Sequence, residues 1–175
     1  FNIGTGLKDD TDKNYRIAKI NTNKCALSWL GKILKISWIT PQMCILFQAG
    51  MSERRRFIDR LTSSLDSLHL NRVYKYEKLL RQRSKILTQL NCDKTWLDTV
   101  ERQISEFSVA ITASRLEMVE ALNDLYNKEL NDNHLIDNFP PADIKLEGKI
   151  EELLINKPAL EVEGYVKDTL KKSRF

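Results

Sequence analysis

The sequence has few of the residues from which metal and nucleophile sites are built. Its 175 residues include three cysteines and two histidines. Cys25, Cys44 and Cys92 are widely spaced with no CxxC pair, and neither His69 nor His134 has a companion at ligand spacing. This excludes the usual sequence patterns of a zinc site. We interpret the cysteines as reduced thiols of a cytoplasmic protein.

A phosphate-binding loop and a long apolar run are also missing from the sequence. No G-x-x-x-x-G-K-[ST] pattern occurs anywhere in it. The most apolar stretch, residues 26 to 49, is too interrupted to cross a bilayer. The interruptions are Lys32, Lys35, Pro41 and Gln42. We therefore expect no membrane span and no hydrolysis of ATP by this chain alone.

The net charge says little about a partner, and the two ends of the chain suggest a fragment. A net charge of +4 permits contact with DNA and does not demand it. The chain opens on Phe1 instead of Met, and it closes on Arg174 and Phe175 without a helix stop signal. We expect it to be a piece of a longer protein.

Residues 1 to 50 have the pattern of a β-rich segment. Apolar and polar positions alternate from residue 15 to residue 20, and a polar turn precedes them. Proline cannot donate to a strand ladder, so Pro41 ends the segment's last strand. We expect paired strands at residues 1–7 and 15–20, a short helix at 27–34 and a strand at 35–39.

Residues 51 to 138 have the pattern of a helical segment. Ser52 is placed to cap the first helix. Its expected apolar stripe is Phe57, Ile58, Leu61 and Leu65. The next helix alternates intervals of three and four at Val73, Tyr76, Leu80, Arg83, Leu87 and Leu90. A third helix repeats this alternation at Leu97, Val100, Ile104, Phe107, Ile111, Ser114 and Met118.

Two such seams on either side of a tight turn predict an antiparallel helical hairpin. Folding at the turn places Leu87 opposite Val100 and Arg83 opposite Ile104. The outgoing helix, from residue 94 to about residue 130, is roughly 55 Å long at about 1.5 Å per residue. Arg83 lies in the apolar seam, where a guanidinium must reach solvent or pair. Glu101 is the acceptor we expect across the hairpin.

Residues 139 to 175 return to mixed structure. Pro140 and Pro141 end the helical segment. Ile144, Leu146 and Ile150 suggest a strand. A helix is expected from Pro158 to the end of the chain, although Gly164 weakens it.

An ordered set of motifs in this chain resembles the RecF family of ABC/SMC-like ATPases. The family has a strand that ends in an aromatic residue, a small polar residue and a proline, followed by a glycine and by a helix that starts Arg-Arg-x-Phe-Leu-Asp. If the helix motif is shifted by one residue for the third arginine, this chain matches the pattern at Trp38, Thr40, Pro41, Gly50, Arg55, Arg56 and Asp59. A Tyr-x-Arg-x-Leu-x-Gln-Arg-Asn run is matched by Tyr76, Lys78, Leu80, Gln82 and Arg83. Further on, Trp96, Ile111 and Arg115 match. The chain departs from the family's pattern at Ser84, Leu97, Ser108, Val109 and the pair Gln42-Met43.

The resemblance implies an α+β fold, namely part of an ABC/SMC-like ATPase head with a β-rich segment and a long antiparallel helical arm. Residues 1–50 would belong to the first lobe, residues 51–138 to the helical lobe, and residues 139–175 would return towards another lobe. It implies a parent protein of recombinational repair that acts at single-strand gaps and helps to load recombinase. ATP and Mg, an ATP-dependent homodimer, DNA, and the proteins RecR and RecO are implied as its cofactors and partners.

The candidate site residues each have two interpretations. By resemblance to ABC-type ATPases, Gln42 senses magnesium and the terminal phosphate; otherwise it is an exposed polar residue. Arg54, Arg55 and Arg56 lie in a first helical turn, where the macrodipole disfavours cations. They either contact DNA phosphates or pair with Glu53, Asp59 or another lobe. The group Lys75, Lys78, Arg81 and Lys85 forms either a solvated face or a DNA-facing stripe.

A different class of function also fits the same pattern. The hairpin of a non-enzymatic interaction module would bind a partner protein, and the β-rich segment would serve as a small scaffold.

Overall fold

The structure is a computed structural model that describes residues 2–7, 16–26, 38, 40–89, 93–132 and 142–174. The side chains of Gln42, Cys44 and residues 129–132 lie outside this description. The chain divides into two compact units, Phe1–Leu46 and Phe47–Phe175, and each is described by itself. The lobe boundaries at residues 50 and 138 remain predictions.

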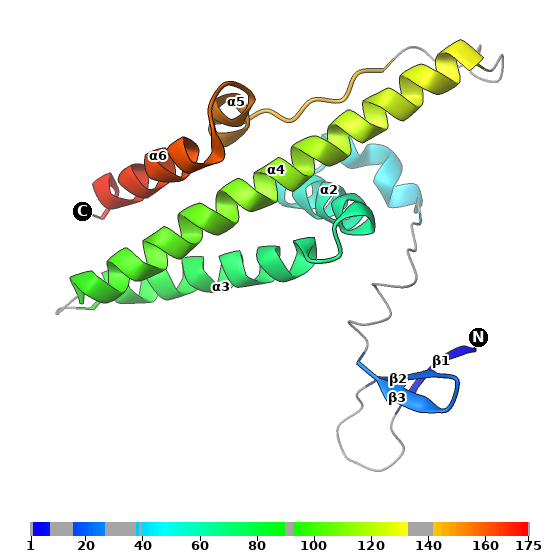
Figure 1. The fold of residues 1–175 in the computed structure, drawn as a ribbon, viewed down its shortest axis with the longest axis horizontal. Coiled ribbons are helices and arrows are strands. Elements are labelled where there is room, and N and C mark those ends of the chain that lie inside the picture. The colour runs from blue at the N-terminus through cyan, green and yellow to red at the C-terminus, as the bar shows by residue number, and fades with distance from the viewer. Residues whose placement is uncertain are drawn as a thin grey trace. The chain divides into compact units, whose positions relative to one another are not determined.

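The first unit contains a three-stranded antiparallel sheet in the order β1-β2-β3 (Figure 1). The strands are β1 (Ile3–Leu7), β2 (Arg16–Ile20) and β3 (Asn23–Cys25). Ala18 on β2 is fully buried. A positive φ of 53° at Asn21 turns the chain from β2 into β3, which is a conformation that asparagine tolerates. The predicted pairing of the first two strands is confirmed.

The predictions for residues 27 to 39 lie outside the described residues, except for Trp38, which is in no strand. The chain then enters a 3₁₀ segment, η1 (Pro41–Gln48), which is kinked at Ile45. Pro41 stands at its first position, where its fixed φ and missing N–H cost nothing.

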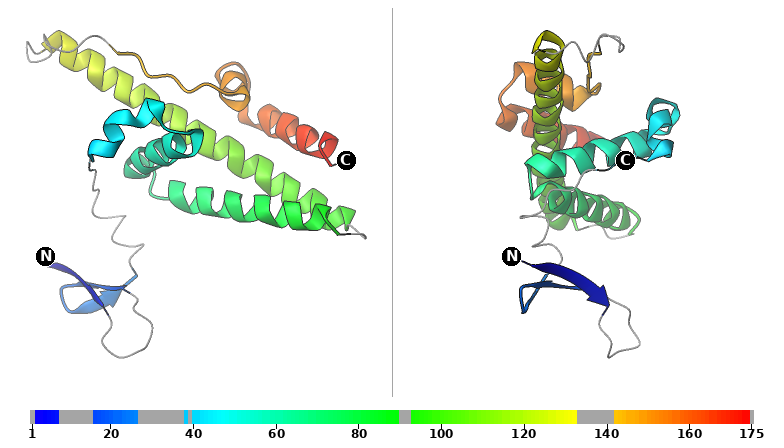
Figure 2. Two further views of the ribbon diagram at one scale, coloured as in Figure 1. Left: turned by 180° about the vertical axis from the view of Figure 1, so that it is seen from behind. Right: turned by 90° about the vertical axis from the view of Figure 1, so that its right-hand side faces the viewer.

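The second unit is built around one long helix (Figures 1 and 2). Its helices are α2 (Met51–Leu65), α3 (His69–Leu87), α4 (Lys94–Asp132), α5 (Lys149–Asn156) and α6 (Ala159–Lys172). Helices α3 and α4 form the predicted antiparallel hairpin, and α2, α5 and α6 also pack on α4. One core cluster joins Leu79 and Ile86 of α3 to Leu97, Val100 and Ile104 of α4, with Leu87 packed against it. Of the helices in the described residues, none has the length and apolar character needed to cross a membrane.

The apolar seam of α3 differs by one residue from the predicted one. Leu79 is 9% exposed and Ile86 is 1% exposed, whereas Leu80 is 38% exposed. The pairs Leu79-Leu80 and Ile86-Leu87 offer two stripes of the same spacing that share Tyr76 and Arg83. Packing against α4 selects the stripe that includes Leu79 and Ile86.

Helix α4 is buried more widely than one seam predicts. Five residues of the expected seam are buried: Leu97, Val100, Ile104, Ile111 and Met118. Val109 and Thr112 are buried as well, because α4 has helices packed on more than one face. An outgoing helix of this length was predicted and is confirmed.

Three local predictions are wrong. Gly50, not Ser52, is the N-cap of α2, since the helix already begins at Met51. Leu65 is 62% exposed at the end of that helix, because the chain leaves α2 there and turns towards α3. Residues 142–147 form no strand, and Ile150 is helical. The Asn123 side chain binds both the N–H and the C=O of Ile144, at 3.0 and 2.9 Å, which are the groups that a neighbouring strand would have bound.

The helix after Pro158 is confirmed. Pro158 is the N-cap of α6, at φ −59°, and Gly164 lies inside the helix without ending it.

Candidate nucleic-acid interface

A buried ion pair fixes the start of the helical unit onto α4. Arg115 on α4 donates two hydrogen bonds to Asp59 on α2, from Nε to Oδ1 at 2.8 Å and from Nη2 to Oδ2 at 2.9 Å. His69, fully buried at the start of α3, approaches Asp59 Oδ1 with Nε2 at 2.7 Å. A carboxylate only accepts, so Nε2 carries the proton. The Asp59 carboxylate therefore joins α2, α3 and α4.

The environment of Asp59 favours its charged form. Burial raises the pKa of Asp59, but the hydrogen bonds and charges of His69 and Arg115 outweigh burial and hold that pKa below its usual value. Its position in the sequence suggests Asp59 as a partner for the neighbouring arginines. Its partner is instead Arg115, which lies 56 positions along the chain.

A second buried carboxylate fixes α6 onto the hairpin. Glu101, fully buried on α4, accepts from Arg83 Nε at 2.9 Å, as predicted, and also from Arg174. Arg83 also donates from Nη2 to the carbonyl oxygen of Leu170 at 2.8 Å. Arg174 binds Asp98 as well, and this hydrogen bond lowers the pKa of Asp98. Arg83 is therefore a structural residue of the hairpin.

The three consecutive arginines of α2 have three different environments. Arg54 donates from Nη1 to the carbonyls of Phe47 and Ala49 at 3.4 and 3.3 Å. Arg56 pairs with Glu53 at 2.8 Å on the exposed surface. Arg55 is exposed and has no hydrogen bond or ion pair to any described residue. The predicted Glu53 partner is thus confirmed for one of the three.

A pocket of about 410 Å³ is lined by residues of α2, α3, α4 and α5. Arg55 and Arg56 of α2, Tyr76 and Glu77 of α3, and Glu151 of α5 are among them. Burial raises the pKa of Tyr76, while the charges of Arg115 and Arg55 act in the opposite direction. The arginines of α2 therefore adjoin the edge of α3 that carries Glu77.

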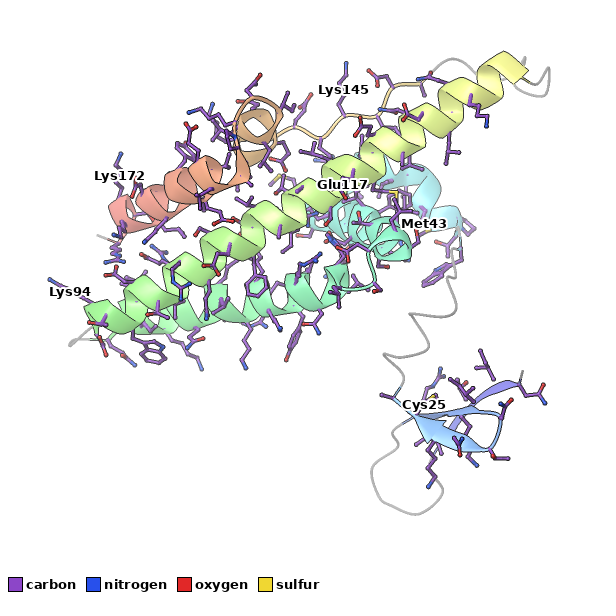
Figure 3. All side chains as sticks on the ribbon, in the orientation of Figure 1. Cys25, Met43, Lys94, Glu117, Lys145 and Lys172 are labelled. Carbon is purple, nitrogen blue, oxygen red and sulfur yellow. The ribbon has the colours of Figure 1, made fainter. Side chains whose placement is uncertain are left out.

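The basic group of α3 is exposed, as expected for its outer surface. Lys75, Lys78, Arg81 and Lys85 are all exposed. Lys75 lies over the Phe107 ring at 5.9 Å from the centroid, an attractive arrangement for a cation. Arg81 approaches Glu77 at 3.8 Å, with both side chains more than half exposed, so this pair contributes little. Figure 3 shows side chains projecting from the edge of α3 that faces away from α4.

Charge is distributed unevenly between the two helices of the hairpin. Helix α3 has one acidic residue, Glu77. Its basic residues are Arg72, Lys75, Lys78, Arg81, Arg83 and Lys85. The basic residues of α4 are Lys94, Arg102, Arg115 and Lys128. Its acidic residues are Asp98, Glu101, Glu106, Glu117, Glu120, Asp124, Glu129 and Asp132. The hairpin thus has a basic helix and an acidic one.

Only some of the basic side chains of α3 have an acidic partner within the described residues. Arg72 pairs with Asp66, and Arg83 pairs with Glu101. Lys75, Lys78 and Lys85 have no carboxylate partner among the described residues. These lysines are available to an anionic partner.

Gln42 lies in η1, and its side chain is outside the described residues. Its sensing role remains a prediction. In the parts of the chain that the structure describes, no three His, Cys, Asp or Glu side chains are grouped to hold a metal ion.

Sequence reasoning missed two parts of this framework. In the sequence, His69 has no companion at metal-ligand spacing, and Arg174 stands at the end of the chain without a helix stop signal. Both contact residues more than nine positions away, so no local spacing could have found them. Arg115 could have been found, since it was among the motif residues.

The comparisons with known proteins agree with this architecture. The chain is 33% identical over 165 residues to "DNA replication and repair protein RecF" of Rickettsia bellii, and 37% identical over 166 residues to that of Mesorhizobium japonicum. It is 33% identical over 174 residues, 99% of its length, to the protein of that name from Agrobacterium fabrum. The chain belongs to the RecF family. No family model matches it.

The match to these RecF proteins covers nearly the whole chain but less than half of each relative. The aligned region covers 92% of this chain and 43% of the Rickettsia bellii protein, 92% and 42% for the Mesorhizobium japonicum protein, and 99% and 45% for the Agrobacterium fabrum protein. A solved structure, described as the recombination mediator protein RecF-ATP in the RecFOR pathway, superimposes with a TM-score of 0.64 at 21% identity. It covers 91% of this chain and 43% of that one. The fold is therefore the predicted one, part of a RecF head with a helical arm.

Proposed function

We propose that this chain serves in DNA replication and repair as the helical part of a RecF-type protein, and that it contacts DNA through the outer surface of α3. The observation that carries the proposal is the concentration of unpartnered cations on that helix. Lys78 and Lys85 are exposed and have no carboxylate partner among the described residues, and Arg81 has only a weak one. The names of the relatives support a repair role.

The energetics favour a polyanion over a small anion. Exposed lysines gain little from single ions in water, whereas each phosphate that a protein neutralises on DNA releases condensed counterions. The acidic composition of α4 disfavours DNA on that helix and so favours one orientation. Arg55, at the pocket beside α3, extends the basic surface towards α2.

The finer role that we propose follows the family. The complete protein would act at single-strand gaps, help to load recombinase with RecR and RecO as partners, and dimerise when it binds ATP. The name of the solved neighbour, with its ATP and its RecFOR pathway, supports the nucleotide and the partners in this proposal. The action at gaps, the recombinase loading and the dimer follow from family resemblance alone. The present sequence has no phosphate-binding loop, and its described residues offer no metal cluster. We therefore assign the binding of ATP and Mg to other parts of a complete RecF protein.

In this proposal Gln42 links the state of the nucleotide to the helical unit. It is the second residue of η1, five positions before the helical unit begins at Phe47. A side chain that senses magnesium and the terminal phosphate there would pass the nucleotide state to α2. The Arg54 hydrogen bonds to Phe47 and Ala49 would carry a shift of this segment into the first turn of that helix.

The test measures DNA affinity after equal charge is removed from two places. One variant carries Lys78→Gln, Arg81→Gln and Lys85→Gln. Its control carries Lys145→Gln, Lys149→Gln and Lys157→Gln, which remove three exposed lysines that pair with Asp143, Glu152 and Glu161. Affinity for a labelled gapped DNA is read by fluorescence anisotropy at low salt.

We expect the α3 variant to bind about tenfold more weakly or worse, and the control to stay within about twofold. Equal losses in both variants would mean that only net charge matters. No loss in the α3 variant would overturn the proposed DNA contact and would favour a protein partner for the hairpin.

A further inference from the structure

The outer face of α3 carries an aromatic side chain in line with its cations. Tyr74 is 63% exposed. Lys78, Arg81 and Lys85 follow it at four, seven and eleven positions. At about 100° per residue these four side chains fall within an arc of about 60°, so they form one straight row. Lys75 lies about 100° around the helix from Tyr74, over the Phe107 ring.

The row has one apolar end and one basic end. Leu70, one turn before Tyr74, is 51% exposed. From Tyr74 to Lys85 the row is about 16 Å long at about 1.5 Å per residue. Phosphates lie about 3.4 Å apart along the axis of each strand in B-form DNA and farther apart in an extended single strand, so this length spans at most about five nucleotides of one strand.

We propose that this row, Tyr74-Lys78-Arg81-Lys85, is a docking site for single-stranded DNA in which Tyr74 stacks on an unpaired base. The inference rests on the proposed function, because it assumes that α3 faces DNA, and it adds which form of DNA and which residue selects it. A basic track with an exposed aromatic ring is how proteins hold single strands without reading sequence, since every base offers a flat face to the ring. In a duplex the base faces are stacked inside, and a tyrosine on a convex helix surface has nothing to stack on.

The geometry also explains why an exposed tyrosine suits this position. Neither the Tyr74 ring nor its hydroxyl has a hydrogen bond, ion pair or ring contact within the described residues. Most of its side chain is open to solvent, at 63% exposure. Removing it therefore costs the fold little, and a loss of binding would report on the ligand.

The experiment uses the whole chain and three ligands of equal length: labelled oligothymidylate, an abasic strand, and a duplex. Tyr74→Ala should weaken binding to oligothymidylate by about fivefold or more, since one base stack is worth about 1–3 kcal/mol. It should leave binding to the abasic strand and the duplex unchanged. Tyr74→Phe keeps the ring and should bind oligothymidylate about as tightly as the unchanged chain does. Tyr165→Ala on α6 removes a tyrosine of 44% exposure away from the row and should have no effect on any ligand.

Two further variants separate charge from stacking. Lys78→Ala should weaken binding to oligothymidylate and the abasic strand equally. Lys75→Ala removes the same charge outside the row and should weaken both less.

The failures of the two proposals are distinguishable. If Lys78→Ala weakens binding while Tyr74→Ala acts equally on oligothymidylate and the abasic strand, or has no effect, the stacking inference is wrong and DNA contact by α3 stands. If none of the three DNAs binds, or if no α3 variant matters, both proposals are wrong.

Discussion

Arg115 holds Asp59 with two hydrogen bonds, of 2.8 and 2.9 Å, across 56 residues of sequence. This pair, together with His69, connects the first three helices of the helical unit at one buried carboxylate. The basic surfaces of α2 and α3 adjoin one another because of this connection. The position of the proposed DNA site thus depends on residues that do not themselves face the DNA.

Arg115→Ala should destabilise the protein strongly, by about 3–5 kcal/mol, because it leaves a buried carboxylate without its main partner. Thermal or urea unfolding measures this. Arg102→Ala provides the control, since Arg102 on the same helix forms an exposed pair with Glu106 at 2.8 Å. Its loss should cost about 0.5 kcal/mol or less. Similar losses in the two variants would show that the buried pair does not hold the helices together.

Acid stability should depend on Asp59. Its pKa in the folded protein lies below the ordinary value of 3.8, so its contribution is complete above that value and is lost as the pH falls through the lower folded pKa. Asp59→Asn should lower stability at neutral pH and should flatten the fall below pH 3.8. Part of the pH dependence of stability should remain in this variant, because the pKa of Asp66 is lowered as well. An unchanged acid limb in the variant would contradict this.

Glu101→Gln should loosen α6 without unfolding the hairpin. The change removes the charge that Arg83 and Arg174 share, while the core of Leu97, Val100 and Ile104 remains. Hydrogen exchange should speed up in residues 159–174 more than in α3. Glu106→Gln, at an exposed site on the same helix, is the control and should change neither. Faster exchange spread evenly over all the helices would mean general destabilisation.

Ile86→Ala and Leu80→Ala test which stripe of α3 faces α4. Ile86 is 1% exposed, so its truncation should cost about 2–5 kcal/mol. Leu80 is 38% exposed, and its truncation should cost about 1 kcal/mol or less. Unfolding free energies in urea provide the comparison. A larger cost at Leu80 would support the originally predicted seam.

The sequence predicted the features of this fold that depend on local periodicity. Alternating intervals of three and four located both helices of the hairpin, and the length of α4 followed. The Arg83–Glu101 contact was predictable, because an arginine in an apolar seam needs an acceptor and the hairpin brings few acceptors near it. The Trp38 to Arg115 motifs then indicated the family.

Other features depend on tertiary contacts and could not be predicted. Leu79 and Leu80 fit equally spaced stripes, and only packing against α4 distinguishes them. The strand expected at Ile144 failed because the Asn123 side chain binds that backbone. The Asp59–Arg115 pair joins distant parts of the chain, so the nearer arginines were the natural candidates. The basic residues of α3 were found from sequence, but the row that includes Tyr74 was not.

The salt dependence of DNA binding tests most directly whether α3 contacts phosphates. The logarithm of the association constant is plotted against the logarithm of salt concentration, for the chain and for the variant with Lys78→Gln, Arg81→Gln and Lys85→Gln. Each phosphate contact contributes about 0.7–0.9 to the slope, so removing three cations should make the variant's slope shallower by about 2–3. The same slope in both proteins would contradict contact between this surface and DNA.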